Sequence, residues 1–249
     1  MCPGYLVSRL RHILYNYDEH SHPASEHHAT LLHESGIELQ EIDRLMAGLA
    51  APGASRHSAT TFPIAFAPTG LPGCLEVVPR VADDERGRFV KFFHAPSYAA
   101  CGLEHDFAEA FYTTSRRGAI RGMHLQLPPS EQAKLVWCVA GTMVDVLLDL
   151  RRGSPTYGKH VSLELEESVP RGLYIPPGVA HGFCATTDRS ILGYLVTSVH
   201  SPQHDSGVRW DSFGMEWPGR SPIVSARDAM LPALEEFVTP FEFADPADG

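Results

Sequence analysis

Short apolar runs separated by glycine and proline dominate the chain after residue 74. The runs are rich in Val, Leu, Phe and Tyr, and almost no stretch between them has helical spacing. They lie at Leu75–Val78, Arg88–Phe93, Phe111–Thr114, Lys134–Val139, Thr142–Asp149, His160–Leu165, Gly172–Ile175, Gly182–Thr186 and Ile191–Val199. Strands at such close spacing predict a mainly β fold, an antiparallel sandwich or barrel.

The first 50 residues follow a different period. Between Tyr5 and Leu49 apolar residues recur at helical spacing, and Ala51-Pro52-Gly53 closes the segment. Residues 51–73 are rich in Pro and Gly, which is the composition of a linker. The pattern therefore predicts a small helical extension over 1–50, a linker over 51–73 and one β domain over 74–249.

Composition narrows the classes of function. The chain has 249 residues, 43% of them hydrophobic, which is enough for a sizeable buried core. A formal net charge of −10 argues against a nucleic-acid binder or a binder of anionic membranes. The longest apolar runs are far shorter than the roughly 20 residues of a membrane span, and residues 1–20 carry Arg and His where a signal peptide is apolar. We therefore expect a cytoplasmic protein.

Cysteine and histidine spacing indicates no familiar metal motif. The five cysteines are odd in number and lack C-x-x-C spacing, so we expect reduced thiols. Six of the 14 histidines lie in the extension, at His12, His20, His22, His27, His28 and His33. No cysteine accompanies them at finger spacing, so a solvated helical face is favoured over a metal site.

The stretch Ile120–Gln126 combines a cation, a glycine and a histidine. Strand alternation sends Gly122, His124 and Gln126 to one face and Arg121 to the other, unless a bulge intervenes. A histidine that points into a barrel near Lys134 would suit a general base. The alternative is a hydrogen-bonded core histidine.

A second block, Gly172–Phe183, holds a P-x-G-x-x-H turn that is typical of cupin barrels. His181 in this turn is either a functional or a structural residue. A metal-dependent cupin would use His124, Glu131 and His181, but Gln126 stands where such a site needs a second histidine. Because amide oxygen is a poor ligand for zinc or iron, a site without metal or organic cofactor is the better hypothesis.

Ordered matches between about Leu75 and Ala233, roughly two-thirds of the chain, resemble the nucleotide-linked 4-keto-6-deoxyhexose 3,5-epimerases, typified by dTDP-4-dehydrorhamnose 3,5-epimerase. The matching strings are Asp84-Glu85-Arg86-Gly87, Arg121-Gly122-Met123-His124-Leu125-Gln126, Gln132-Ala133-Lys134-Leu135-Val136, Asp145-Val146 with Asp149-Leu150-Arg151, Ser154-Pro155-Thr156-Tyr157-Gly158-Lys159, Ile175-Pro176-Pro177-Gly178-Val179-Ala180-His181-Gly182-Phe183, Gly207-Val208-Arg209-Trp210, Trp217-Pro218 and Ser225-Ala226-Arg227-Asp228.

The resemblance implies a dimeric, metal-free jelly-roll barrel that acts on a nucleotide-diphosphate sugar. His124 would be the general base, Asp228 its orienting carboxylate, Tyr194 the general acid and Lys134 the group that stabilises an enolate oxygen. The chemistry suits these types, because a ketone at C4 acidifies C3 and C5 and inversion needs a different acid on the opposite sugar face.

For the substrate the resemblance implies that Arg86 and Arg121 hold the diphosphate and that His181 supports the pocket. The candidate substrate-binding residues are Arg86, Arg121, Gln126, His181, Glu109 and His200. The departures from the family pattern are Glu109 and Phe111 for a usual Gln and Asn, Leu195 for Lys, His200 for Tyr, Lys91 for a carboxylate and Trp137 for Arg. They leave the nucleotide, the sugar and the number of epimerised carbons open.

We therefore expect an isomerase that inverts C3, C5 or both of a nucleotide-activated 4-keto-6-deoxysugar through an enolate, with neither nucleic acid nor membrane as a partner. Two alternatives stand beside it. One is the metal-dependent cupin enzyme described above. The other is a non-catalytic cupin that binds sugar nucleotides.

Overall fold

The computed structural model describes residues 64–244, and the predicted helical extension over 1–50 lies outside them. The strands are β1 (Ala65–Pro68), β2 (Leu75–Val78), β3 (Arg80–Asp84), β4 (Gly87–Lys91), β5 (Glu109–Ser115), β6 (Ile120–Gln126), β7 (Lys134–Ala140), β8 (Thr142–Asp149), β9 (His160–Glu166), β10 (Gly172–Ile175), β11 (Val179–Ala185), β12 (Ser190–Val196) and β13 (Asp205–Gly207). The helices are α4 (Ala95–Ala99), α5 (Ala226–Ala229) and the 3-10 turn η1 (Leu234–Glu236).

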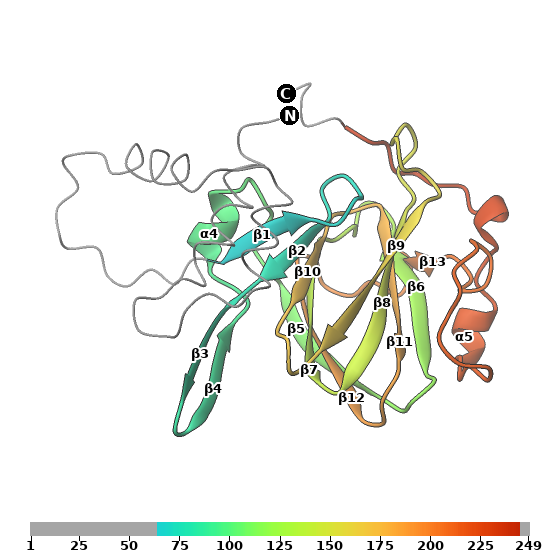
Figure 1. Cartoon of the computed structure of the whole chain (residues 1–249). Coiled ribbons are helices and arrows are strands. Elements are labelled where there is room, and N and C mark those ends of the chain that lie inside the picture. Colours follow the sequence, from blue (N-terminus) through green and yellow to red (C-terminus); the bar gives the residue numbers. More distant parts are fainter. Residues whose placement is uncertain (1–63, 245–249) are drawn as a thin grey trace, which may run out of the picture. The chain divides into compact units, whose positions relative to one another are not determined.

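Two sheets make up most of the described fold (Figure 1). One sheet has six strands in the order β1-β2-β10-β7-β12-β5, and the other has five in the order β13-β6-β11-β8-β9. Pairs such as β6 with β11 and β12 with β5 run antiparallel. The prediction of a mainly β, antiparallel fold is confirmed.

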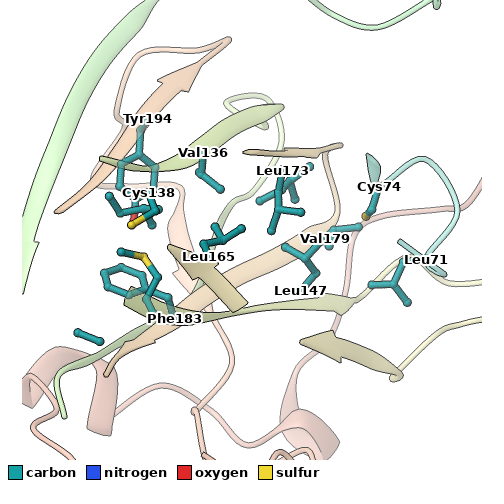
Figure 2. Packing of buried hydrophobic residues seen from close by; sticks show 14 residues of the cluster. Leu71, Cys74, Val136, Cys138, Leu147, Leu165, Leu173, Val179, Phe183 and Tyr194 are labelled. Atoms are coloured by element: carbon teal, nitrogen blue, oxygen red, sulfur yellow. The ribbon is translucent and has the colours of Figure 1, made fainter. Parts of the chain in front are cut away.

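Apolar side chains from both sheets meet in one core cluster (Figure 2). Val136 of β7 and Leu173 of β10 come from the six-stranded sheet, while Leu147 of β8 and Phe183 of β11 come from the five-stranded sheet. Each of these four side chains is almost completely buried, so the cluster joins the two sheets by removing apolar surface from water. Tyr194 of β12 belongs to the same cluster.

A second apolar cluster covers the opposite face of the five-stranded sheet. Successive strand residues point to opposite faces, so Leu147 of β8 joins the first cluster while Val146 and Leu148 join the second. Phe213 and Phe241, from the segment after β13, pack on this second face. The C-terminal segment thus lies against the sheet that carries β6, and its helix α5 contacts β6.

The two-stranded hairpin β3–β4 pairs only with itself and projects from the two sheets (Figure 1). Its turn holds the Asp84–Arg86 ion pair, in which the arginine side chain is 85% exposed. The hairpin therefore contributes little to the core, and most of its residues are at least partly exposed.

The predicted strands agree with the structure most closely at β2, β8 and β10, whose bounds match. β1 lies inside the 51–73 range that composition assigned to a linker, so folded structure begins before Cys74. β3, β13 and α4 had no counterpart among the predicted runs. Among the described helices, none is long and apolar enough to cross a membrane.

Candidate functional site

His124 lies on β6, where it pairs in register with His181 of β11 and with Gly207 of β13. Its side chain is 27% exposed, and its Nε2 lies 2.8 Å from Oδ1 of Asp228. These two residues are 104 positions apart in the chain. The structure thus brings the predicted base together with its predicted carboxylate.

Asp228 is the buried residue of the one-turn helix α5. Ser225 caps this helix by accepting a hydrogen bond from the Asp228 backbone N–H, so the carboxylate itself is free to reach β6. Its Oδ2 accepts a hydrogen bond of 3.1 Å from the backbone N–H of Gly122. Both carboxylate oxygens therefore have donors on the same strand, which fixes the orientation of the group.

Glycine at position 122 allows this arrangement. Its φ is +123°, which side chains rarely adopt, and a Cβ there would lie 2.6 Å from the Cα of Gly182 on β11. β6 and β11 can therefore approach each other closely beside the imidazole. Any larger residue at this position would displace the strand that carries His124.

The charges around the pair set its protonation. Burial raises the pKa of Asp228, but hydrogen bonds from His124 and Gly122 and the charge of Arg227 outweigh it, so the pKa lies below its usual value. Burial lowers the pKa of His124 and the Asp228 carboxylate raises it, while the charges of Lys134 and Arg227 lower it again. The net result is a pKa below that of a free histidine, which keeps the imidazole neutral near pH 7.

Lys134 begins β7, and its buried Nζ donates a hydrogen bond of 3.0 Å to the backbone carbonyl of His124. Burial lowers the pKa of this ammonium to about 8, and the charges of Asp205 and Asp145 act in the opposite direction. A cation is thus held beside the base in a site with little water, where it acts strongly on any negative charge that develops.

Tyr194 lies on β12 and is 8% exposed. Its ring stacks on Phe111 at a centroid distance of 4.7 Å and meets the edge of His181 at 5.9 Å. Burial and the charge of Asp145 raise the pKa of the phenol well above its usual value. The hydroxyl therefore carries its proton at neutral pH and can serve as a proton donor.

A second histidine–aspartate pair is buried beside Tyr194. Nε2 of His181 lies 2.8 Å from Oδ2 of Asp145, and both side chains are almost completely buried. Asp145 Oδ1 has no hydrogen-bond partner within the described residues. Burial raises the pKa of Asp145, although His181 and Lys134 oppose this effect.

The remaining predicted binding residues lie in three places. Arg121 donates to Ser115 Oγ at 3.1 Å and to the Thr114 carbonyl at 3.2 Å. The buried Gln126 accepts from the Ser201 N–H at 2.6 Å and donates to the Ser130 carbonyl at 2.7 Å, so its amide holds two loops together. The residues lining a pocket of about 670 Å³ are Glu109, Ala110, Phe111, Gln132, Val196 and His200. Phe111 connects this pocket to Tyr194.

Arg86 lies outside the two main sheets and the loops that connect their strands. It lies in the turn of the β3–β4 hairpin, where both its backbone N–H and its guanidinium donate to Asp84. Neither of these contacts involves the residues around His124.

The three residues of the alternative metal set do not form a cluster. Glu131 is exposed, and His124 and His181 each direct Nε2 to a separate carboxylate. Within residues 64–244, no three His, Cys, Asp or Glu side chains converge so that they could hold an ion. The residues present therefore do not fit the metal-dependent alternative.

Sequence reasoning missed three charged residues of this site. Arg227 lies next to Asp228 in the Ser-Ala-Arg-Asp string, so its neighbour was a usable signal. Asp145 lies among the core residues of β8, and Asp205 belongs to the three-residue strand β13. Nothing in the local sequence of the two aspartates indicates that they meet a histidine or an arginine.

Comparisons with known proteins identify the family to which the chain belongs. A family model described as dTDP-4-dehydrorhamnose 3,5-epimerase matches residues 68–236. The dTDP-4-dehydrorhamnose 3,5-epimerase of Shigella flexneri is 38% identical over 163 residues, which cover 64% of this chain and 90% of that protein.

Solved structures show the same likeness. A 4-keto-6-deoxy sugar epimerase from the novobiocin biosynthetic gene cluster of Streptomyces spheroides gives a TM-score of 0.67 at 34% identity, over 75% of this chain and 93% of its own. A 3'-monoepimerase from Streptomyces bikiniensis, in complex with dTDP-quinovose, gives 0.65 at 32% identity, over 68% and 87%. The predicted cupin-like jelly-roll barrel is thereby confirmed.

Proposed function

Since the chain belongs to the dTDP-4-dehydrorhamnose 3,5-epimerase family and is an epimerase, we propose that it inverts C3, C5 or both of a dTDP-linked 4-keto-6-deoxyhexose through an enolate. The observation that carries the proposal is the His124–Asp228 pair, with Lys134 bonded to the same stretch of β6. No bound metal or organic cofactor is needed for the steps below.

In the first step His124 removes a proton from the carbon next to the C4 ketone. Nε2 is engaged with Asp228, which leaves Nδ1 as the ring nitrogen for the carbon-bound proton. The C–H bond breaks, its electron pair forms a double bond between that carbon and C4, and the π pair of the C4 carbonyl moves onto the oxygen, which becomes negative. The ammonium of Lys134 stabilises this charge, and Asp228 stabilises the imidazolium.

In the second step Tyr194 delivers a proton to the opposite face of the same carbon. The enolate collapses to the ketone, the phenol becomes a phenolate, and the carbon is inverted. Exchange with solvent then removes the proton from His124 and restores it to Tyr194. The raised pKa of Tyr194 supports this role, since it keeps the phenol protonated until the enolate takes the proton.

Deuterium incorporation tests the two roles separately. We would incubate the protein with dTDP-4-keto-6-deoxyglucose in deuterated water and follow C3 and C5 by NMR. The native protein should incorporate label and invert at least one carbon. His124→Asn should abolish both label and inversion, whereas Tyr194→Phe should retain label at the carbon that His124 attacks and lose inversion.

Matched substitutions control for loss of fold. His105→Asn changes a histidine whose ring contacts the Leu103 carbonyl, and Tyr157→Phe changes a 44% exposed tyrosine in the loop between β8 and β9. Both should keep native activity. Absence of label in the native protein with dTDP- and other 4-keto sugar nucleotides would overturn the proposal. Retained binding without label would instead favour the non-catalytic alternative.

We also propose a homodimer in which Arg86 serves the site of the other copy. The projecting hairpin and the exposed Phe89, Phe111 and Tyr112, which are 53%, 46% and 70% exposed, favour a partner surface. Mixing Arg86→Met with His124→Asn protein should restore activity, because a mixed dimer contains one site with both native residues. A monomer by light scattering, or no restoration after mixing, would contradict it.

The cysteines support a cytoplasmic location for this activity. Cys74, Cys101, Cys138 and Cys184 are all free thiols in the described part of the chain. Burial raises the pKa of Cys74 and of Cys138 to about 12 in each case, which keeps these thiols protonated and unreactive. Free thiols are typical of a reducing compartment.

A further inference from the structure

Arg227 lies against the proposed base, and the chemistry described above gives it no task. Its Nη1 is 3.1 Å from Nε2 of His124 and 3.5 Å from Oδ1 of Asp228. Its Nη2 is 2.6 Å from Oδ2 of Asp205 on β13, the strand that pairs with β6. One guanidinium thus spans from the edge strand of the sheet to the histidine–aspartate pair.

Arg227 and Asp228 cannot both be satisfied at Nε2 of His124. A ring nitrogen has one in-plane direction, which holds either an N–H or a lone pair. With the N–H, His124 donates to Asp228 and faces a cation. With the lone pair, it accepts from Arg227 and faces an anion. Arg227 and Asp228 therefore act on the protonation of His124 in opposite directions.

We propose that Arg227, anchored by Asp205, is a positioning residue that keeps His124 uncharged beside Asp228 until the imidazole takes a proton from substrate. This inference rests on the proposed role of His124 as the base. A carboxylate at 2.8 Å alone would favour the imidazolium, and an imidazolium cannot accept a proton. Arginine suits the opposing role because its charge does not titrate at physiological pH.

Other groups around the imidazole act on it as well. The charged and titratable groups that face His124 are Asp228 and Arg227 from α5, Lys134 from β7, Asp205 from β13 and, across the strand pair, His181 from β11 with its partner Asp145. Lys134 acts in the same direction as Arg227. The test must therefore leave Lys134 in place and change only the Arg227–Asp205 pair.

Two substitutions should move the pKa of His124 in opposite directions. Arg227→Met removes the cation and should raise this pKa by roughly half a unit to one unit, a modest shift because the arginine is 47% exposed and partly screened. Asp205→Asn removes the anion that offsets the guanidinium and should lower it. Arg227→Lys keeps the charge and should stay closer to the native value than Arg227→Met. A role limited to holding α5 in place predicts no such reversal of sign.

The pKa would be measured by NMR titration of labelled imidazole in the free protein, with His124→Asn identifying the resonance. The acidic limb of the kcat/KM profile should shift with it. Arg152→Met is the matched control, since Arg152 pairs with Glu242 and neither residue has a contact with His124. It should leave both readouts unchanged.

The outcomes are distinct. An unchanged or lowered pKa in Arg227→Met, or shifts of the same sign in Arg227→Met and Asp205→Asn, would overturn the inference. If Arg227→Met fails to fold, the direction of the Asp205→Asn shift alone decides it. If the two shifts are opposite but the protein exchanges no deuterium into any 4-keto sugar, the effect of Arg227 on the pKa of His124 is supported and only the proposed function is overturned.

Discussion

Two histidine–aspartate pairs lie side by side in this fold, and they differ in exposure and in the surroundings of their carboxylates. His124–Asp228 and His181–Asp145 both have an Nε2–Oδ distance of 2.8 Å, and the two histidines face each other across β6 and β11. The His124 side chain is 27% exposed, whereas that of His181 is 4% exposed. Only the first pair therefore offers its ring to a molecule that enters from solvent.

The two carboxylates also differ, in the direction in which their pKa values are shifted. The pKa of Asp228 is lowered because both oxygens receive hydrogen bonds, from His124 and from the Gly122 N–H, and these outweigh its burial. The pKa of Asp145 is raised by burial, and one of its oxygens has no partner within the described residues. Identical residue types at an identical distance thus form a base with a stabilised counter-charge in one place and, in the other, a buried carboxyl whose charged form is disfavoured.

The largest effect should follow from neutralising the carboxylate of the first pair, Asp228, and a smaller effect from neutralising that of the second, Asp145. Asp228→Asn keeps the shape of the side chain but loses the charge that stabilises the imidazolium, so kcat should fall by a factor of about 10² to 10⁴. Asp145→Asn should reduce kcat by less, because His181 is not the group that takes the proton. Steady-state kinetics on both variants measures the difference. An equal or larger loss in Asp145→Asn would contradict the assignment of the base to the first pair.

Lys134 is bonded to the first pair and acts through its charge on the second. It bonds to the His124 carbonyl, and its pKa is raised by the charge of Asp145 but lies at about 8 because burial dominates. Only the ammonium stabilises an enolate, so kcat should be retained below pH 8 and fall as the pH rises through about 8. Lys134→Met should lower kcat by about 10² to 10³ and remove this basic limb. A basic limb that survives in Lys134→Met would assign it to another group.

The sequence predicted part of this arrangement, for identifiable reasons. β8 and β10 were located because each carries a run of apolar side chains near turn residues. β3 and β13 were not predicted, because exposed or very short strands show no regular recurrence of apolar residues. The lesson is that burial, and not strand formation itself, produces the pattern that can be read from sequence.

The residues of the site also differ in how far the sequence could indicate them. His124 and Asp228 were paired only through the family resemblance, since no local pattern links residues 104 positions apart. Asp145 was matched in the resemblance but given no role, because an aspartate in a strand is usually solvent-facing, whereas β8 has both faces covered. Asp205 meets Arg227 only through the pairing of β13 with β6. Such contacts depend on register, which the sequence of a single strand does not specify.

The smallest effect concerns stability and has opposite signs in the two pairs. The folded-state pKa of Asp228 is lowered, so its contribution to the free energy of unfolding is present above the unfolded pKa of about 3.9 and is lost as the pH falls through the folded pKa. The folded-state pKa of Asp145 is raised, so its contribution is present below about pH 3.9 and is lost as the pH rises through its folded pKa.

Denaturant unfolding between about pH 3 and pH 7 separates the two contributions. Asp228→Asn should flatten the gain in stability that the native protein shows on leaving acid, whereas Asp145→Asn should make that gain steeper. Asp106→Asn, at an exposed position outside the strands, is the control and should follow the native curve. Curves that change in the same direction in both pair variants would mean that Asp145 is stabilised as an anion. Its burial would then not distinguish it from Asp228, and the contrast between the two pairs would have to rest on the exposure of His124 alone.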